Sequence, residues 1–222
     1  MRSRLEFTSR ADGDLSVHHA DPTLDERRRR LVDHPWSWMR QVHGSRVVRV
    51  TEPGGCAGEV ADAAITTCAG AVLAVLTADC VPLAFVGEGI VGVAHVGWRG
   101  LMAGVVDKTV DALRACAGDV ELHAEIGPCI RARCYEFGST DLDSVAERFG
   151  PEVRATSAAG RPALDLPAGI TSALARLGVP PPVDSGVCTA CSPAHWSFRA
   201  HAATERQALI AWLEPSTRPA PQ

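Results

Sequence analysis

An unbroken apolar run in the middle of the chain, Ala71–Leu76 (AVLAVL), places the tightest constraint on the fold. The run is too short for a core helix and has no polar residue for a solvent-facing side, which is typical of a strand buried on both faces. Two more apolar segments follow, Leu83–Val86 and Ile90–Ala94, and the sequence Gly87-Glu88-Gly89 between them predicts a hairpin turn. The sequence therefore predicts a buried sheet with at least one antiparallel pair.

Helical and strand patterns are interspersed through the rest of the chain. Helices are expected at Leu24–Val32, Leu101–Cys116, Asp141–Phe149, Pro167–Leu177 and Thr204–Leu213, and strands at Arg46–Val50, Val120–Ile126 and Val183–Val187. This mixture favours a mixed α/β or α+β domain over a purely parallel sheet. No shift in composition marks a boundary, so residues 1–213 are expected to form a single domain. The Pro-rich, polar segment 214–222 is expected to be a disordered tail.

Charge and hydropathy argue against two classes of partner. Lys and Arg number 22 and Asp and Glu 26, so the net charge is −4, whereas a general nucleic-acid binder carries a basic stripe. The dense basic run Arg27–Arg30 is interpreted as a solvated helix face. No apolar stretch approaches the ~18 residues that a membrane span needs, and the N-terminal residues lack the apolar region of a secretory signal. We therefore expect a cytoplasmic protein that binds neither nucleic acid nor membrane.

The chain contains eight cysteines, spread through apolar segments. In a protein without a secretory signal these are expected to be reduced thiols, most of them small buried side chains. The pair Cys188 and Cys191 forms a C-x-x-C motif, which is typical of half a zinc knuckle or of a redox pair. A second such motif is absent, and the spacing of Cys129 and Cys134 does not complete a usual zinc ribbon. A structural role is therefore the favoured interpretation of this pair.

Three metal-competent side chains stand at junctions between predicted strands and loops, where sites are usually built. They are His43 in RQVHG, Cys80 in TADC, and His95 just after the strand Ile90–Ala94. Taken singly, such residues are more often hydrogen-bonded loop residues or core, and their spacing matches no common zinc motif. Together, however, two imidazoles and one thiolate make a three-ligand zinc site whose fourth position is open, as catalytic zinc requires.

The segment His95–Gly100 (HVGWRG) also has features of an anion site. Backbone N–H groups at the start of the expected helix Leu101–Cys116 attract anions, and Arg99 adds a fork of donors suited to phosphate. The alternative is that Arg99 pairs with a carboxylate while Trp98 only packs. Glycine-rich phosphate loops and the G-x-S-x-G elbow of serine hydrolases are both absent.

Several motifs together resemble one family over nearly the whole chain, from about Phe7 to Leu213. They are RQVHG (40–44), ADAAIT (61–66), LTADCVP (76–82), AHVGWRG (94–100), EIGPCI and CYEFG (125–138), LDL (164–166) and CTACSPAHWSFR (188–199). This set resembles the laccase-domain, or multicopper polyphenol oxidase-like, family, whose members are read as purine nucleoside phosphorylases. The motifs RQVHG, LTADCVP and AHVGWRG are specific for this family when they occur together.

The resemblance implies a fold, a site and an activity. The fold is a mixed β-sandwich flanked by helices, in α/β/β/α layers. His43, Cys80 and His95 are implied to be catalytic and to converge on one metal, usually zinc, with copper as the other possibility. The implied reaction is phosphorolysis of adenosine, inosine and methylthioadenosine, with adenosine deamination as a side activity. Arg10 and Arg199 lie in matching segments and join Arg99 as candidates for phosphate binding.

Two segments depart from the family pattern and bear on substrate range. Ala11-Asp12-Gly13-Asp14 replaces the usual Gly-Gly-x-Ser, and Ala200-His201 replaces an Arg-Asp pair.

Two other functions compete with phosphorolysis at the level of sequence. One is copper-dependent oxidation of phenols, but a multicopper oxidase needs many paired histidines, and this chain has eight in total. The other is a non-enzymatic regulatory role, which the net charge neither supports nor excludes. For the enzyme, the expected partners are purine nucleosides and phosphate, and the expected state is a monomer or a homodimer.

Overall fold

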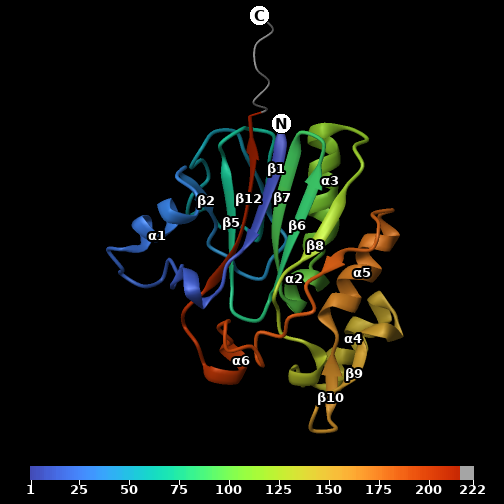
Figure 1. Ribbon diagram of the computed structural model, residues 1–222. Helices are drawn as coiled ribbons and strands as arrows, with labels where there is room; N and C mark the ends of the chain where they lie inside the picture. Colours follow the sequence, from blue (N-terminus) through green and yellow to red (C-terminus); the bar gives the residue numbers. More distant parts are fainter. Residues whose placement is uncertain (216–222) are drawn as a thin grey trace, which may run out of the picture.

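The computed structural model describes residues 1–215, in which two β-sheets pack face to face (Figure 1). The first sheet has the strand order β1-β12-β5-β2 and the second the order β11-β8-β6-β7-β4-β3. The strands of the first sheet are β1 (Arg2–Phe7), β2 (Trp36–Trp38), β5 (Val72–Thr77) and β12 (Gln207–Glu214). Those of the second are β3 (Val47–Val50), β4 (Ala63–Thr66), β6 (Val81–Gly87), β7 (Ile90–Val96), β8 (His123–Ile126) and β11 (Val183–Asp184).

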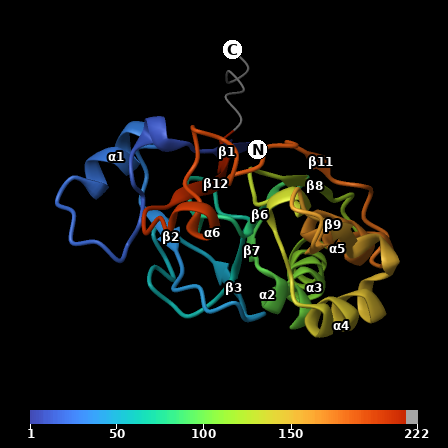
Figure 2. The same ribbon diagram turned by 90° about the horizontal axis from the view of Figure 1, so that it is seen from below.

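Helices lie outside both sheets (Figure 2). They are α1 (Leu24–Leu31), α2 (Trp98–Met102), α3 (Val105–Ala117), α4 (Ser139–Phe149), α5 (Leu166–Arg176) and α6 (Phe198–His201). Three 3₁₀ turns, η1 (Arg10–Asp12), η2 (Ala132–Cys134) and η3 (Pro151–Val153), and a small hairpin of β9 (Arg154–Thr156) and β10 (Pro162–Leu164) complete the described elements. Figure 1 places α1 on one side of the sandwich and α3, α4 and α5 on the other.

The alternation of side chains along β5 explains how the layers hold together. Leu73 and Val75 point into a core between the two sheets, while Val72, Ala74 and Leu76 pack on the opposite face, in the cluster that includes Leu24 and Leu31 of α1. Because both faces of the strand are covered, a run without polar residues is what this position requires. The strand predicted at Ala71–Leu76 is confirmed in this central place.

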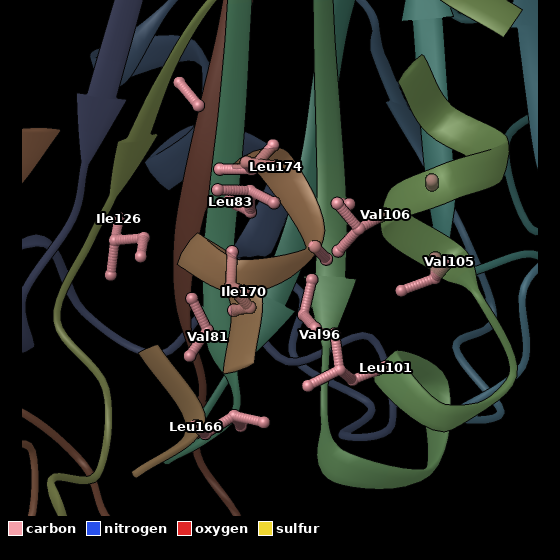
Figure 3. Packing of buried hydrophobic residues seen from close by; sticks show 14 of the residues in the cluster. Val81, Leu83, Val96, Leu101, Val105, Val106, Ile126, Leu166, Ile170 and Leu174 are labelled. Atoms are coloured by element: carbon pink, nitrogen blue, oxygen red, sulfur yellow. The ribbon is translucent and has the colours of Figure 1, made fainter. Parts of the chain in front are cut away.

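The largest core lies between the second sheet and its helices (Figure 3). Val81, Leu83 and Val96 project from β6 and β7, and the side chains that cover them come from α2, α3 and α5: Leu101, Val105, Val106, Leu166, Ile170 and Leu174. With α1 on the far side of the first sheet, the order of layers is α/β/β/α. The predicted α+β class, a mixed β-sandwich flanked by helices in a single domain, is confirmed.

Local signals in the sequence account for several elements. The predicted hairpin is β6–β7, an antiparallel pair whose turn contains Gly89 at φ 71°, a conformation that favours glycine. Helix α5 begins as expected, because the Asp165 side chain accepts a hydrogen bond from the backbone N–H of Ala168. The expected helices at Leu24–Val32 and Asp141–Phe149 are α1 and α4.

The helix expected at Thr204–Leu213 is wrong, because these residues form most of strand β12. β12 lies between β1 and β5 and is covered on both faces, with Leu209 and Ala211 in the core between the sheets and Ile210 on the α1 side. Such burial removes the alternation that marks a strand, and Ala and Leu favour helices locally. β12 also includes Glu214, the first residue of the expected tail, and the tail's residues 216–222 lie outside the described residues.

The helix expected at Leu101–Cys116 is two helices. α2 ends at Met102 and α3 begins at Val105, because Gly104 between them adopts a left-handed conformation with φ 84°. The segment before α3 is therefore a short helix of five residues and not the start of a long one. Among residues 1–215, none of the helices is both long and apolar enough to span a bilayer.

Candidate functional site

His43, Cys80 and His95 come together at one end of the sandwich. His43 lies in the loop between β2 and β3, Cys80 in the turn between β5 and β6, and His95 near the end of β7, just before α2. The His43 Nε2 atom lies 3.6 Å from the Cys80 Sγ atom, and the ligand atoms of the three residues all lie within 4.8 Å of one another. The two imidazole rings meet edge to face, with centroids 4.8 Å apart. The structure thus brings together the three residues singled out in the sequence.

Asp62 organises this cluster, although sequence reasoning gave it no role. Its side chain is completely buried, and one carboxylate oxygen, Oδ1, accepts hydrogen bonds from the His95 ring nitrogen Nδ1 and the His43 backbone N–H, both at 2.9 Å. The other oxygen accepts the backbone N–H groups of Gly44 at 2.8 Å and Val42 at 3.2 Å. One carboxylate therefore positions two of the three candidate ligands.

The backbone around the cluster is strained and tightly packed. His43 has φ 57°, in the left-handed region that non-glycine residues seldom adopt, and the bonds to Asp62 hold it there. Gly97 lies against the cluster, and a Cβ atom at this position would lie 2.6 Å from His43 Cδ2 and 3.1 Å from Cys80 Sγ. Glycine is therefore the residue that leaves room for the His43 ring.

The electrostatics of the cluster favour a charged thiol. Burial alone would raise the pKa of Cys80, but the neighbouring His95 and His43 outweigh it and lower this pKa to about 6. Burial would lower the pKa of His95, yet the Cys80 thiolate and the Asp62 carboxylate raise it to about 9. The pKa of Asp62 lies below its usual value, because hydrogen bonds from His95 and Gly44 outweigh the effect of burial.

These residues fit a metal ion. Two imidazole nitrogens and one thiolate sulfur are ligands that zinc and copper both accept. Because the Nδ1 atom of His95 is engaged by Asp62, its Nε2 atom is left free to bind a metal, which is the usual arrangement of a ligating histidine with a supporting carboxylate. The three donors leave room for a fourth ligand from the adjoining pocket.

A pocket of about 470 Å³ opens beside the cluster. This volume lies within the range of ordinary small-molecule sites. Ionisable side chains line it, among them the three candidate ligands and Arg99, Arg199 and Arg206. Apolar side chains cover much of the rest of the wall. The pocket therefore combines a metal-competent cluster with positive charge and apolar surface.

Aromatic rings hold two of these arginines in place. Trp98, Phe137 and Tyr135 stack edge to face in a row, with neighbouring centroids 5.3 and 5.4 Å apart. The Arg99 guanidinium lies 4.7 Å from the Trp98 ring and that of Arg199 lies 4.9 Å from the Tyr135 ring. Each guanidinium is attracted to the face of its ring, so both positive charges are held at the pocket wall.

The three arginines expected to bind phosphate do not share one place. Arg99 and Arg199 line the pocket, whereas Arg10 is not among its lining residues and donates a hydrogen bond from Nε to the His195 carbonyl oxygen at 2.9 Å. Arg206 does line the pocket but was missed, because it lies just before β12 in the segment expected to be helical. The role of Arg10 in phosphate binding stays a prediction.

Asp79, the neighbour of Cys80, supports the wall of the pocket. Sequence reasoning left open whether this residue orients a histidine or caps a turn. Its carboxylate accepts hydrogen bonds from the Arg199 backbone N–H at 2.6 Å and from the Thr189 hydroxyl at 2.7 Å. Asp79 therefore holds the segment before and within α6, whereas Asp62 orients the histidine.

Comparison with known proteins identifies the family. Residues 7–214 match the model of the family described as multi-copper polyphenol oxidoreductase laccase. The chain belongs to this family. It is 41% identical over 181 residues to a purine nucleoside phosphorylase of Streptomyces coelicolor, a match that covers 80% of this chain and 74% of the relative. A purine nucleoside phosphorylase of Pseudomonas aeruginosa is 35% identical over 205 residues, covering 87% of this chain and 82% of the relative.

Solved structures of the family share the fold. The crystal structure of the Neisseria meningitidis protein NMB0706 superimposes with a TM-score of 0.84 at 28% identity, covering 96% of this chain and 95% of that one. YlmD from Geobacillus stearothermophilus gives a TM-score of 0.83 at 27% identity, covering 96% and 92%. The two-sheet sandwich that carries the His43–Cys80–His95 cluster is therefore the family fold.

Proposed function

We propose that this protein is a purine nucleoside phosphorylase that cleaves adenosine, inosine and methylthioadenosine with phosphate. The products are the free base and ribose 1-phosphate or its methylthio analogue. The observation that carries the proposal is that one pocket is lined both by the Arg99 and Arg199 side chains and by the metal-competent cluster. The relatives named purine nucleoside phosphorylase support it.

The phosphate is proposed to bind between Arg99 and Arg199. Among residues 1–215 neither guanidinium forms a salt bridge with a carboxylate, so neither charge is neutralised by an acidic side chain, although the Arg199 Nη1 atom donates a hydrogen bond to the Glu136 carbonyl oxygen at 3.0 Å. A guanidinium donates two parallel hydrogen bonds to phosphate oxygens and is always charged. Helix α2 has only five residues, so the site rests on these side chains and not on a helix dipole.

The nucleoside is proposed to bind over the apolar part of the pocket. Phe198 lines the pocket with 60% of its surface exposed, and a purine ring can stack on it. Val17 and Leu166 line it as well and add apolar surface. The Thr77 hydroxyl also lies at the pocket, buried and without a hydrogen-bond partner among the described residues. It is available to a polar group of the substrate.

In the reaction, a phosphate oxygen attacks C1′ as the bond from C1′ to the purine breaks. The base leaves with the electron pair of that bond and takes up a proton, and the sugar passes through a state with oxocarbenium character. Arg99 and Arg199 hold the nucleophile in line and prevent its loss to solvent. Asp62 and Gly97 keep His43, Cys80 and His95 in one arrangement throughout.

His43, Cys80 and His95 are the residues proposed to hold the metal, and zinc is the ion proposed. When bound, zinc supplies a Lewis acid and lowers the pKa of a water molecule to ~7, which suits the proposed side activity of adenosine deamination. Copper oxidase chemistry is less well supported. Multicopper oxidation needs paired histidines, whereas in residues 1–215 only two histidines take part in a group of metal-competent side chains.

The test uses purified protein with inosine, with and without phosphate. Phosphorolysis predicts ribose 1-phosphate as the sugar product and release of hypoxanthine only when phosphate is present. Release of free ribose at the same rate in phosphate-free buffer would identify a hydrolase and overturn the proposal. Adenosine is assayed separately for inosine and ammonia, which report the deaminase activity alone.

A further inference from the structure

A second group of sulfur atoms lies outside the His43–Cys80–His95 cluster. Cys134 at the end of η2 meets Cys188 and Cys191 of the C-x-x-C motif, and the three Sγ atoms all lie within 4.8 Å of one another. The Cys134 and Cys191 sulfurs are 3.2 Å apart. None of these cysteines lines the pocket described above. The C-x-x-C motif therefore has a third partner, more than fifty residues away in the chain, that its local spacing does not reveal.

We propose that Cys134, Cys188 and Cys191 bind a second zinc ion. Three thiolates are soft ligands of the kind that zinc selects, and two of them have the short spacing of structural zinc sites. Cys191 is exposed, so an ion can reach the site from solvent. Nothing in the mechanism proposed above uses this site.

The backbone of the motif brings Cys188 and Cys191 close together. The N–H groups of Cys191 and Ser192 both bond to the Cys188 carbonyl oxygen, at 3.2 and 2.9 Å, which folds the motif into a tight turn.

The number of converging sulfurs favours a metal over a disulfide. A disulfide joins two sulfurs at about 2.05 Å and would leave the third without a partner. Here all three cysteines share one place, which a single divalent ion explains and a single disulfide does not. A disulfide between Cys134 and Cys191 is the alternative outcome of the test.

The site lies beside two segments that build the pocket wall. Tyr135, next to Cys134, carries the Arg199 guanidinium on its ring, and Thr189, next to Cys188, hydrogen-bonds to Asp79. A zinc ion would therefore join η2 to the loop before α6, the two segments that build this wall of the pocket. Its loss is expected to loosen the wall without touching the first metal site.

Zinc content after dialysis tests the proposal. In a Cys80→Ser variant, which lacks a ligand of the first site, about one equivalent of zinc per chain should remain. Adding Cys191→Ser should remove it, and adding Cys68→Ser, a half-buried thiol elsewhere, should not. Because Cys191 is exposed, its substitution by serine is not expected to prevent folding. Cobalt loaded into the Cys80→Ser variant should give a strong thiolate charge-transfer band that the Cys191→Ser change abolishes.

Two results would overturn the proposal. One is a Cys80→Ser variant that folds, retains all its free thiols and yet binds neither zinc nor cobalt. The other is that zinc-treated protein loses two free thiols in air and that peptide mapping finds Cys134 linked to Cys191. That result would identify a redox pair.

Discussion

Replacing Asp62 by Asn tests whether this buried carboxylate holds the metal cluster together. The substitution keeps the size of the side chain and turns one of its two oxygens into an NH2 group. If the NH2 group takes the place of Oδ2, it faces the N–H groups of Val42 and Gly44, and two charge-assisted hydrogen bonds are lost. If it takes the place of Oδ1, it faces His95, whose proton must move to Nε2, the atom needed for the metal.

Either orientation has a measurable cost. A hydrogen bond to a charged group contributes ~1.5–3 kcal/mol, so losing two predicts a fall of about 3 kcal/mol or more in the free energy of unfolding. For a chain of this size that corresponds to a melting temperature lower by roughly 6–12 °C. Loss of the carboxylate that supports a metal ligand typically lowers metal affinity by about 10–100-fold. Asp62→Asn is therefore expected to show both effects.

The assay is zinc binding by calorimetry, together with thermal unfolding of the zinc-free protein. Leu113→Ala is the matched control, because it removes a fully buried side chain of α3 and should cost about 2–5 kcal/mol without changing zinc affinity. Equal zinc affinity in Asp62→Asn and the wild type would refute the argument that Asp62 positions the ligands. So would a loss of affinity of the same size in Leu113→Ala, since instability alone would then explain it.

Three other perturbations test the site. Gly97→Ala should lower zinc affinity about tenfold or more, because the new Cβ displaces the His43 ring. Gly138→Ala is the control, since a Cβ there meets open space. A zinc affinity of Gly97→Ala equal to that of the wild type in calorimetry would contradict the steric argument. In zinc-free protein the pKa of Cys80 is about 6, so half of this thiol is deprotonated near pH 6 and most of it at pH 7. Alkylation of Cys80 should therefore be half-maximal near pH 6 and blocked by zinc, whereas a midpoint near the ordinary thiol value would count against the thiolate–imidazole pair. Arg99→Ala should raise the phosphate KM roughly tenfold to a hundredfold with zinc content unchanged, and Arg99→Lys should restore the phosphate KM only in part. A phosphate KM unaltered in Arg99→Ala would show that the anion binds elsewhere.

Strand prediction succeeded where the residues of a segment determine its structure by themselves, and it failed where pairing with distant strands determines it. Ala71–Leu76 is too short for a core helix, so its apolar character alone indicates a strand. Thr204–Leu213 begins with four polar residues, and its apolar part is long enough for either structure, so only its position between β1 and β5 makes it a strand. Strand β1 (Arg2–Phe7) was not predicted either, because its residues are largely polar and its partner β12 lies at the other end of the sequence.

The sequence predicted the candidate metal ligands but not the residues that hold them in place. His43, Cys80 and His95 have recognisable chemistry and lie in distinctive motifs. Asp62 stands within the quoted segment ADAAIT, and an aspartate inside a run of buried residues was a signal that something must satisfy it. The contribution of Cys134 to the C-x-x-C motif depends on tertiary contact alone, so no local pattern could have predicted it.

The position of β12 also determines the order in which the protein can be completed during synthesis. The ribosome delivers β1 first and β12 last, yet β1 pairs with β12 and with no other strand of its sheet, in a register that joins Arg2 to Glu214. A nascent chain therefore carries an unpaired first strand and an open edge on β5 until β12 has left the ribosome. Open strand edges are templates for pairing with other chains. Until β12 pairs with β1 and β5, both strands are exposed to such contacts.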